Sequence, residues 1–245
     1  MKKTMILISF IVISIMVNFN YYDNKRVEVL LTGKVVGFNV EDTNEKDKDG
    51  NGFTIKTSSK SVGTMTFIKD NNEFVALAHS MSGKNTELNG ECYEIEFEDV
   101  IKSTENKAGR IIAEINEKSK IGYVYGDTNY GIYGKVENIS VKDYMKIKTA
   151  NRYNVTKGQA YLLINLDGRG IKDYEVEITG IDYLSNTQNI RIKVKSKELI
   201  EISGGIVQGM SGAPLVQNGE LIGAINSVNI NNSLDAYAIF IDKLI

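Results

Sequence analysis

Short stretches in which apolar and polar residues alternate recur along the second half of the chain and in part of the first. The clearest are residues 93–98, 174–178 and 190–195, where every second residue is apolar. This period of two predicts strands with one buried face. Apart from a short helical turn expected at 197–202, no sustained helical periodicity follows residue 22, and turn signals separate the strands. The pattern therefore predicts an all-β fold, and its length suits two β-barrels.

The first 22 residues form a distinct segment. Lys2 and Lys3 precede an apolar run over residues 5–17. A positive start and a short apolar core are typical of a secretory signal or a signal anchor, although the run is shorter than the roughly 20 residues that span a bilayer comfortably. No small-x-small cleavage site follows. We expect an uncleaved hydrophobic helix that associates the chain with a membrane and leaves the rest outside the cytoplasm, with cleavage and secretion as the alternative.

Three regions follow from these patterns. Residues 1–22 are the signal anchor or signal peptide, residues 23–59 a strand-containing extension, and residues 60–245 the main β domain. Residues 47–52 imitate the start of a calcium-binding loop, but Ser58 takes the place of the required glutamate and the flanks read as strands. We expect an acidic hairpin loop there, with no metal site and no cofactor.

Composition narrows the classes of function. The 245 residues are 42% hydrophobic and 24% charged, and the formal net charge is −2. Without a basic block after the first segment, the chain lacks the electrostatic footprint of a nucleic-acid-binding protein. Cys92 is the single cysteine, so no internal disulfide can form. It adjoins an alternating strand, and we expect it to be a packed residue instead of a nucleophile.

One serine lies in a glycine-bounded turn near the C-terminus. Residues 209–212 read Gly-Met-Ser-Gly, and the only proline follows at Pro214. Glycine on both sides of the serine lets the backbone bend sharply and turns its N–H groups outward. Ser211 is the candidate nucleophile, and the N–H groups of Gly209 and Ser211 are the candidate oxyanion hole. Residues 214–225 predict a strand, an Asn-Gly turn and a returning strand, which place the turn beside a buried hairpin.

The chain offers one base for that nucleophile. His79 is the only histidine, and it follows an apolar strand over residues 74–77. In the expected double barrel it belongs to the first half and Ser211 to the second, so the site would lie between the barrels. His79 would accept the hydroxyl proton of Ser211 and pass it to the leaving amine.

Residues 204–214, 76–80 and 62–67 together resemble the sporulation stage IV protein B (SpoIVB) peptidase family. The resemblance covers about residues 60–245 and implies a chymotrypsin-like double β-barrel preceded by an N-terminal hydrophobic helix. It also implies a membrane-associated serine endopeptidase that acts in sporulation signalling. Members of that family usually carry a PDZ domain before the peptidase, and residues 23–59 are too few to form one.

The sequence departs from the family at the third catalytic position. The resemblance implies an aspartate fifteen residues before the nucleophile, where this chain has Ser196. A hydroxyl carries no charge to stabilise the imidazolium, so the triad is weakened or another carboxylate serves. Asp182 and Asp127 are candidates by residue type. On the family pattern, we expect an aspartate introduced at position 196 to raise activity.

Two hypotheses on function follow. The first is a serine endopeptidase that cleaves a protein or peptide substrate outside the cytoplasm. The second is a peptidase-fold module that binds a partner with little or no catalysis, because Ser196 replaces the aspartate and the PDZ domain is missing.

Overall fold

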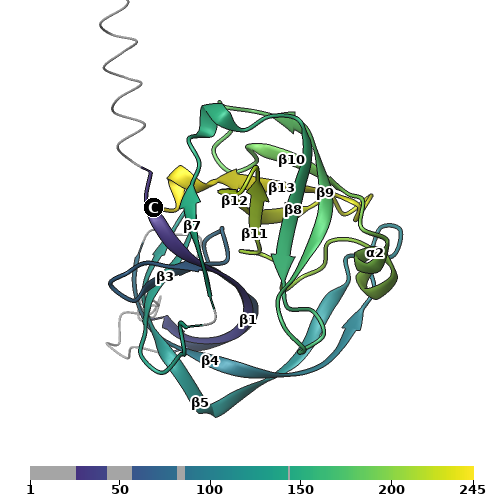
Figure 1. Cartoon of the computed structure of the whole chain (residues 1–245). Helices are drawn as coiled ribbons and strands as arrows, with labels where there is room; N and C mark the ends of the chain where they lie inside the picture. Colours follow the sequence, from purple (N-terminus) through teal and green to yellow (C-terminus); the bar gives the residue numbers. More distant parts are fainter. Residues whose placement is uncertain (1–25, 43–56, 82–85, 143) are drawn as a thin grey trace, which may run out of the picture.

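The computed structural model describes residues 26–42, 57–81, 86–142 and 144–245. The expected N-terminal hydrophobic helix and the calcium-like loop at 47–52 lie outside these residues. Strands dominate the described chain, joined by the α-helix α2 (Lys197–Ser203) and two short 3-10 helices, η1 (Arg152–Asn154) and η2 (Ile241–Lys243) (Figure 1). The predicted all-β class is confirmed. In the part of the chain that the structure describes, no helix is long and apolar enough to cross a membrane.

Thirteen strands form one continuous hydrogen-bonded sheet over the described residues. In chain order they are β1 (Glu28–Asp42), β2 (Thr57–Ile68), β3 (Glu73–Ala76), β4 (Thr86–Ile101), β5 (Arg110–Thr128), β6 (Gly131–Val136), β7 (Met145–Thr149), β8 (Gly158–Ile164), β9 (Lys172–Ile181), β10 (Ile190–Val194), β11 (Pro214–Gln217), β12 (Glu220–Val228) and β13 (Asp235–Phe240).

The sheet closes on itself twice. In the first half, the order β1-β2-β3-β6-β5-β4 is closed by pairing between β1 and β4. In the second half, the order β8-β9-β10-β13-β12-β11 is closed by pairing between β11 and β8. Strand β7 connects the two rings, because it pairs with β1 on one side and with β12 on the other. Figure 1 shows the purple-to-teal ring beside the green-to-yellow one.

Strand β1 corrects the boundary expected from the sequence. Residues 23–59 were assigned to an extension outside the main domain, yet β1 pairs with both β2 and β4 and is one of the six strands of the first ring. The barrel therefore begins at Glu28 and not at residue 60. Alternation along a strand indicates that it has a buried face, but it does not show which strands are its partners.

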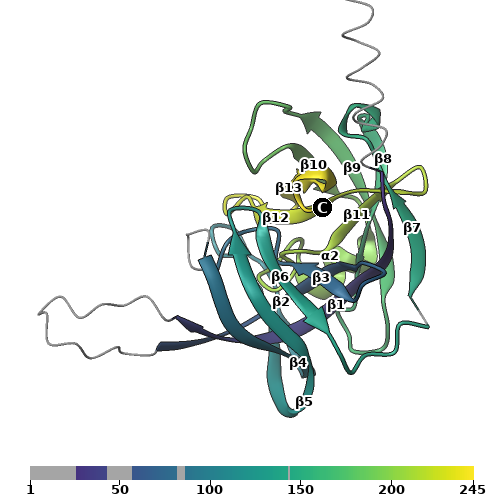
Figure 2. The same cartoon turned by 90° about the vertical axis from the view of Figure 1, so that its left-hand side faces the viewer.

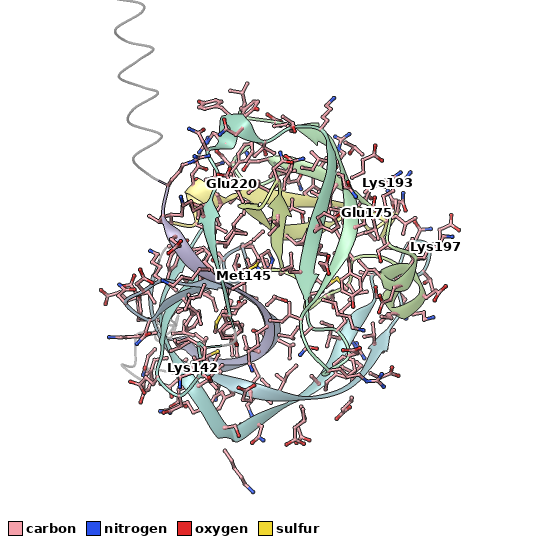
Figure 3. All side chains as sticks on the ribbon, in the orientation of Figure 1. Lys142, Met145, Glu175, Lys193, Lys197 and Glu220 are labelled. Carbon is pink, nitrogen blue, oxygen red and sulfur yellow. The ribbon has the colours of Figure 1, made fainter. Side chains whose placement is uncertain are left out.

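The alternating residues of the second ring divide between core and solvent as predicted. The apolar residues of the alternating runs 174–178 and 190–194 are buried, and Tyr174, Ile178 and Ile192 are at most 1% exposed. Their polar neighbours Glu175 and Lys193 lie on the outer surface (Figure 3). Cys92 is fully buried in the first barrel, and this burial raises the pKa of its thiol, as suits a packed residue.

Candidate active site

The turn that carries Ser211 connects α2 to β11 and depends on glycine. Gly209 and Gly212 have φ values of +100° and +92°, which side chains rarely allow. A Cβ on Gly212 would lie 2.0 Å from the carbonyl oxygen of Thr64. The first barrel therefore approaches the turn so closely that only glycine fits at position 212.

Strand β2 of the first barrel holds this turn by hydrogen bonds. The N–H of Thr64 donates to the carbonyl oxygen of Ser211 at 2.9 Å, and the Thr64 hydroxyl donates to that of Gly209 at 2.7 Å. The buried hydroxyl of Thr66 donates to the carbonyl oxygen of Gly212, also at 2.7 Å. The backbone of the candidate nucleophile is thus fixed by a strand of the opposite barrel.

Among the described residues, the two N–H groups predicted to bind an oxyanion lack the hydrogen-bond acceptors that neighbouring N–H groups have. The N–H groups of Gln208, Met210 and Gly212 each donate to a backbone carbonyl. Within the described residues, those of Gly209 and Ser211 have no acceptor. Two backbone donors in one turn, separated by a single residue and without an acceptor in the described protein, can serve a developing negative charge on a substrate oxygen.

His79 lies in a loop after β3 whose backbone is unusual. The two residues before it, Leu77 and Ala78, have φ values of +71° and +50°. Left-handed residues other than glycine are disfavoured by roughly 1–2 kcal/mol each and cluster at functional sites. The Nδ1 atom of His79 lies 3.0 Å from the carbonyl oxygen of Ser80.

The structure brings His79 and Ser211 to the same cleft. Both line a cavity of about 390 Å³, together with residues of β2 and with Gln208 and Gly209. The described residues include no direct hydrogen bond between the two side chains, since the Ser211 hydroxyl donates to the carbonyl oxygen of Asn226 at 3.5 Å. Catalytic hydrogen bonds are often long or absent in a substrate-free site and shorten in the complex.

Asn226, in β12, links the serine to the histidine loop. Its backbone carbonyl accepts from Ser211, and its side-chain amide donates to the carbonyl oxygen of Ala78 at 2.5 Å. Sequence reasoning missed this residue, because an asparagine in an apolar strand carries no signal until its partner in the other barrel is known.

The carboxylate of Asp127 contacts the loop of His79. Asp127, at the end of β5, is 1% exposed. Its carboxylate accepts from the Ser80 hydroxyl at 2.7 Å and from the Met81 N–H at 3.1 Å. It therefore fixes the two residues that follow the histidine, and it places a negative charge beside that loop.

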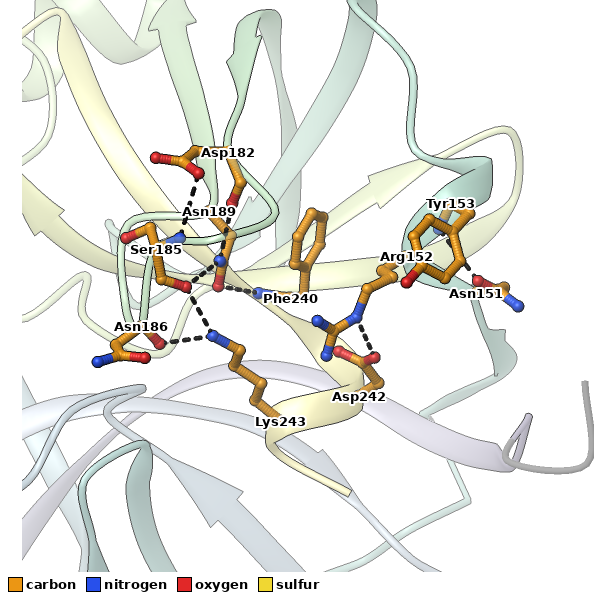
Figure 4. Close-up of polar contacts among 10 residues, drawn as sticks. All are labelled: Asn151, Arg152, Tyr153, Asp182, Ser185, Asn186, Asn189, Phe240, Asp242 and Lys243. Carbon is orange, nitrogen blue, oxygen red and sulfur yellow. Dashed lines mark hydrogen bonds and ion pairs between the residues drawn. The ribbon is translucent and has the colours of Figure 1, made fainter. Parts of the chain in front are cut away.

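The other residues considered for the third position lie elsewhere. The Ser196 hydroxyl caps α2 by accepting from the N–H of Leu199 at 3.3 Å, and no hydrogen bond joins it to His79 among the described residues. Asp182 organises the turn after β9, where its carboxylate accepts from the N–H group of Leu184. It also accepts from the N–H group of Ser185 (Figure 4). Of Asp127, Asp182 and Ser196, the structure places Asp127 alone in hydrogen-bond contact with the histidine loop.

The tip of the β4–β5 hairpin supports the oxyanion segment from the first barrel. Gln208 donates to the carbonyl oxygen of Gly109 at 2.9 Å and accepts from the N–H of Ile111 at 3.0 Å. Nearby, Ser103 donates through its N–H to the carbonyl of Ser203 at 2.8 Å. Figure 1 shows the hairpin extending beneath the second barrel to α2. Nothing in the local sequence predicts this contact.

Two closed six-stranded rings with a serine in a glycine turn and a histidine in the facing loop define the class of chymotrypsin-like serine peptidases. A family model described as SpoIVB peptidase S55 matches residues 48–245. The chain belongs to this family.

Comparison with solved structures gives matches at low sequence identity. The HtrA-type protease AlgW with a tripeptide is 13% identical, with a TM-score of 0.48 over 88% of this chain and 58% of that one. A variant of AlgW with a decapeptide is 14% identical, with a TM-score of 0.47 over 86% and 60%. An inactive form of Rv3671c from M. tuberculosis H37Rv is 13% identical, with a TM-score of 0.40 over 84% and 80%. The chain thus spans about 60% of the length of the AlgW structures. A search of curated proteins found no match.

Proposed function

We propose that this protein is a serine endopeptidase that cleaves a protein substrate outside the cytoplasm, in the signalling that accompanies sporulation. The observation that carries the chemistry is the shared cleft, in which Ser211, His79 and the N–H groups of Gly209 and Ser211 lie together. The family supports the reaction class and the substrate class. The cellular role is supported by the resemblance to sporulation peptidases, and the location by the positive, then apolar, start of the chain.

In the proposed mechanism, the Ser211 hydroxyl attacks the scissile carbonyl while His79 accepts its proton. The carbonyl oxygen gains negative charge in the tetrahedral intermediate and accepts from the N–H groups of Gly209 and Ser211. His79 then gives the proton to the leaving amine, the C–N bond breaks, and an acyl-enzyme remains on Ser211. Water attacks this ester with His79 again as base, which releases the acid and restores the serine.

Asp127 acts as a positioning residue in this mechanism. Through Ser80 and Met81 it holds the loop of His79, and so fixes the place of the base at the cleft that it shares with Ser211. In the proposed reaction the Nε2 atom of His79 accepts the serine proton, while Nδ1 lies 3.0 Å from the carbonyl oxygen of Ser80.

The alternative is a peptidase fold that binds without cleaving. It is favoured by the contact between His79 Nδ1 and the Ser80 carbonyl, and by the absence of a His79–Ser211 hydrogen bond in the described residues.

A serine-directed fluorophosphonate probe separates the two functions. An endopeptidase becomes labelled at Ser211, and the Ser211→Ala variant does not. Equal labelling of the two proteins, or none in either, would contradict the peptidase. In a sporulating host, replacement of the gene by the Ser211→Ala allele is expected to block spore formation, and normal sporulation would remove the proposed cellular role.

A further inference from the structure

The hairpin of β4 and β5 extends beyond the first barrel. Strand β5 pairs with β6 only from Gly122 onward, whereas its pairing with β4 continues back to Arg110. Figure 2 shows β4 and β5 extending past the short strands β3 and β6, and Figure 1 shows the hairpin reaching α2 of the second barrel. The first ring closes without this extension, which instead contacts the other barrel.

The end of the hairpin is hydrogen-bonded to both backbone groups of Gln208. The N–H of Gln208 donates to the carbonyl oxygen of Gly109 at 2.9 Å, and its carbonyl oxygen accepts from the N–H of Ile111 at 3.0 Å. Arg110, between these two residues, forms a parallel β-bridge with Gln208. A hairpin of the first barrel thus supplies the backbone partners of the residue that directly precedes Gly209.

These bonds set the direction of an oxyanion donor. The carbonyl of Gln208 and the N–H of Gly209 belong to one planar trans peptide unit, in which the two groups point in opposite directions. Because the carbonyl points to the N–H of Ile111, the N–H of Gly209 points away from the hairpin. Gln208 and Gly209 both line the cleft that contains His79 and Ser211. The bond from Ile111 therefore orients the peptide that carries the donor.

Glycine at position 209 makes this peptide easy to rotate unless it is held. Gly209 has a φ of +100°, and glycine accepts φ values of either sign. The Thr64 hydroxyl binds the carbonyl of Gly209, which belongs to the next peptide unit. Within the described residues, the hydrogen bond that holds the 208–209 peptide is the one from Ile111. The side chain of Ile111 packs behind the glycine as well, since a Cβ on Gly209 would lie 2.9 Å from its Cδ1 atom.

Ser103 joins the end of the hairpin to the segment that leads to this turn. It is 9% exposed, and its hydroxyl accepts from the N–H of Gly109 at 2.9 Å and donates to the carbonyl oxygen of Ile206 at 3.2 Å. Its own N–H donates to the carbonyl oxygen of Ser203 at 2.8 Å. One buried hydroxyl thus connects the hairpin residue that binds Gln208 with the chain two residues before Gln208.

We propose that the end of the β4–β5 hairpin positions the oxyanion donor of Gly209, and that Ser103 is the positioning residue of this contact. The inference rests on the proposed peptidase function, and it adds a determinant of rate that lies outside the cleft. The donor acts on charge that develops in the transition state, so its misplacement lowers kcat and leaves KM nearly unchanged.

Kinetics of two variants at position 103 test the proposal. A site that the full-length protein cleaves in unfolded casein is identified by mass spectrometry and copied in a quenched fluorescent peptide. Ser103→Ala removes the hydroxyl, and we expect kcat to fall about tenfold with KM within about twofold of wild type, which is less than the effect of losing a whole donor. Ser103→Thr keeps the hydroxyl and is expected to restore kcat to within about threefold of wild type.

A transition-state analogue shows whether the loss lies in the oxyanion site. The part of the peptide before the cleaved bond is made as a trifluoromethyl ketone. The Ser211 oxygen bonds to the ketone carbon, its proton passes to His79, and the ketone oxygen becomes the negatively charged oxygen of a hemiketal. The inhibition constant should rise in Ser103→Ala by the same factor by which kcat falls, because both depend on the same donor.

Thr149→Val is the matched control. It removes another buried hydroxyl that accepts from a backbone N–H, that of Val27 at 3.0 Å, in β7. We expect it to lower the melting temperature about as much as Ser103→Ala does and to leave kcat and the inhibition constant within about twofold of wild type.

Gly109→Ala disturbs the same contact without removing the hydroxyl. A Cβ on Gly109 would lie 2.1 Å from the carbonyl oxygen of Ile101 and 2.5 Å from the backbone nitrogen of Ser103, so the end of the hairpin must shift. The variant is expected to lower kcat and weaken the inhibitor in parallel. Circular dichroism shows which variants are folded at the assay temperature, and Gly109→Ala decides the question if Ser103→Ala is not.

The possible results separate the two proposals. Cleavage by the wild type, with unchanged kcat and inhibition in the hairpin variants, would overturn the role of the hairpin and leave the peptidase standing. A fall in kcat without a matching loss of inhibitor affinity would also overturn that role, as would an equal fall in Thr149→Val. If the wild type shows neither fluorophosphonate labelling of Ser211 nor cleavage, the peptidase is overturned, and the role of the hairpin with it.

Discussion

The turn of Ser211 and the loop of His79 face each other, yet they are held by different means. In the turn, the backbone itself is fixed, since the carbonyls of Gly209, Ser211 and Gly212 all accept hydrogen bonds from β2. The loop is held mainly by side-chain hydrogen bonds from Asp127 and Asn226. The difference indicates that the backbone around Ser211 is set by contact between the barrels, whereas the position of the His79 loop depends on a few side chains. Changes to the turn should therefore affect stability and activity together, and changes to the loop mainly catalysis.

The largest effect is expected at Gly212. A Cβ at this position would lie 2.0 Å from the carbonyl oxygen of Thr64. The residue also has a positive φ, which strains any side chain other than that of glycine. Gly212→Ala should lower the free energy of unfolding by about 3 kcal/mol, as clash and backbone strain combine, and abolish labelling of Ser211. Urea unfolding and fluorophosphonate labelling measure the two effects.

Gly219→Ala is the control for that substitution. Gly219 has a φ of +76°, but nothing lies within 4 Å of its Cβ position. Gly219→Ala therefore measures the loss of free energy of unfolding that comes from backbone strain alone, without a steric clash. Equal losses at Gly212 and Gly219 would show that contact with β2 does not fix the turn.

A smaller effect, confined to rate, is expected at Asp127. Asp127→Asn removes the charge beside the histidine loop and disturbs the acceptors for Ser80 and Met81. We expect kcat to fall about 10- to 100-fold with little change in KM, because misplacing the base affects the transition state. Asp182→Asn, which alters a turn carboxylate far along the chain, should leave kcat unchanged. Equal losses for the two variants, or a fall in KM alone, would exclude a positioning role for Asp127.

The hydroxyl of Thr64 is expected to contribute about fivefold to kcat. Thr64→Val removes the hydrogen bond to the Gly209 carbonyl and loosens one oxyanion donor, which is worth roughly 1 kcal/mol. Thr64→Ser keeps the hydroxyl and is expected to restore most of kcat. A serine variant as slow as the valine variant would assign the loss to packing of the methyl group.

The smallest effect is expected at Ser196. Aspartate caps helices as well as serine does, so Ser196→Asp should change the free energy of unfolding by less than about 0.5 kcal/mol. Since Ser196 caps α2 and has no hydrogen bond to His79 in the described residues, we expect activity within about twofold of wild type. Steady-state kinetics of the Ser196→Asp variant and the wild type measure this change in activity. A large rise would favour the position implied by the family resemblance over Asp127.

What the sequence could predict depends on how local each feature is. Alternation along β9 and β10, and the glycine turn around Ser211, lie in consecutive residues, so the strands could be predicted and a candidate nucleophile could be named. The contacts of Asp127 and Asn226 join residues 46 to 148 positions apart, and no local pattern reveals them. For the same reason the place of β1 in the first barrel could not be foreseen, although its strand character could.

The hydrogen bonds from β2 to the serine turn bear on how the chain acquires its structure. Thr64 and Thr66 bind carbonyls 145 and 146 positions further along the chain. Contacts of such sequence separation form late in folding, because a long loop must close before they stabilise anything. During synthesis, the turn of Ser211 is made after β2, and its backbone is held only once it meets that strand. Docking of the turn on β2 would therefore complete the oxyanion donors, and a chain whose barrels are not yet packed together is expected not to react at Ser211.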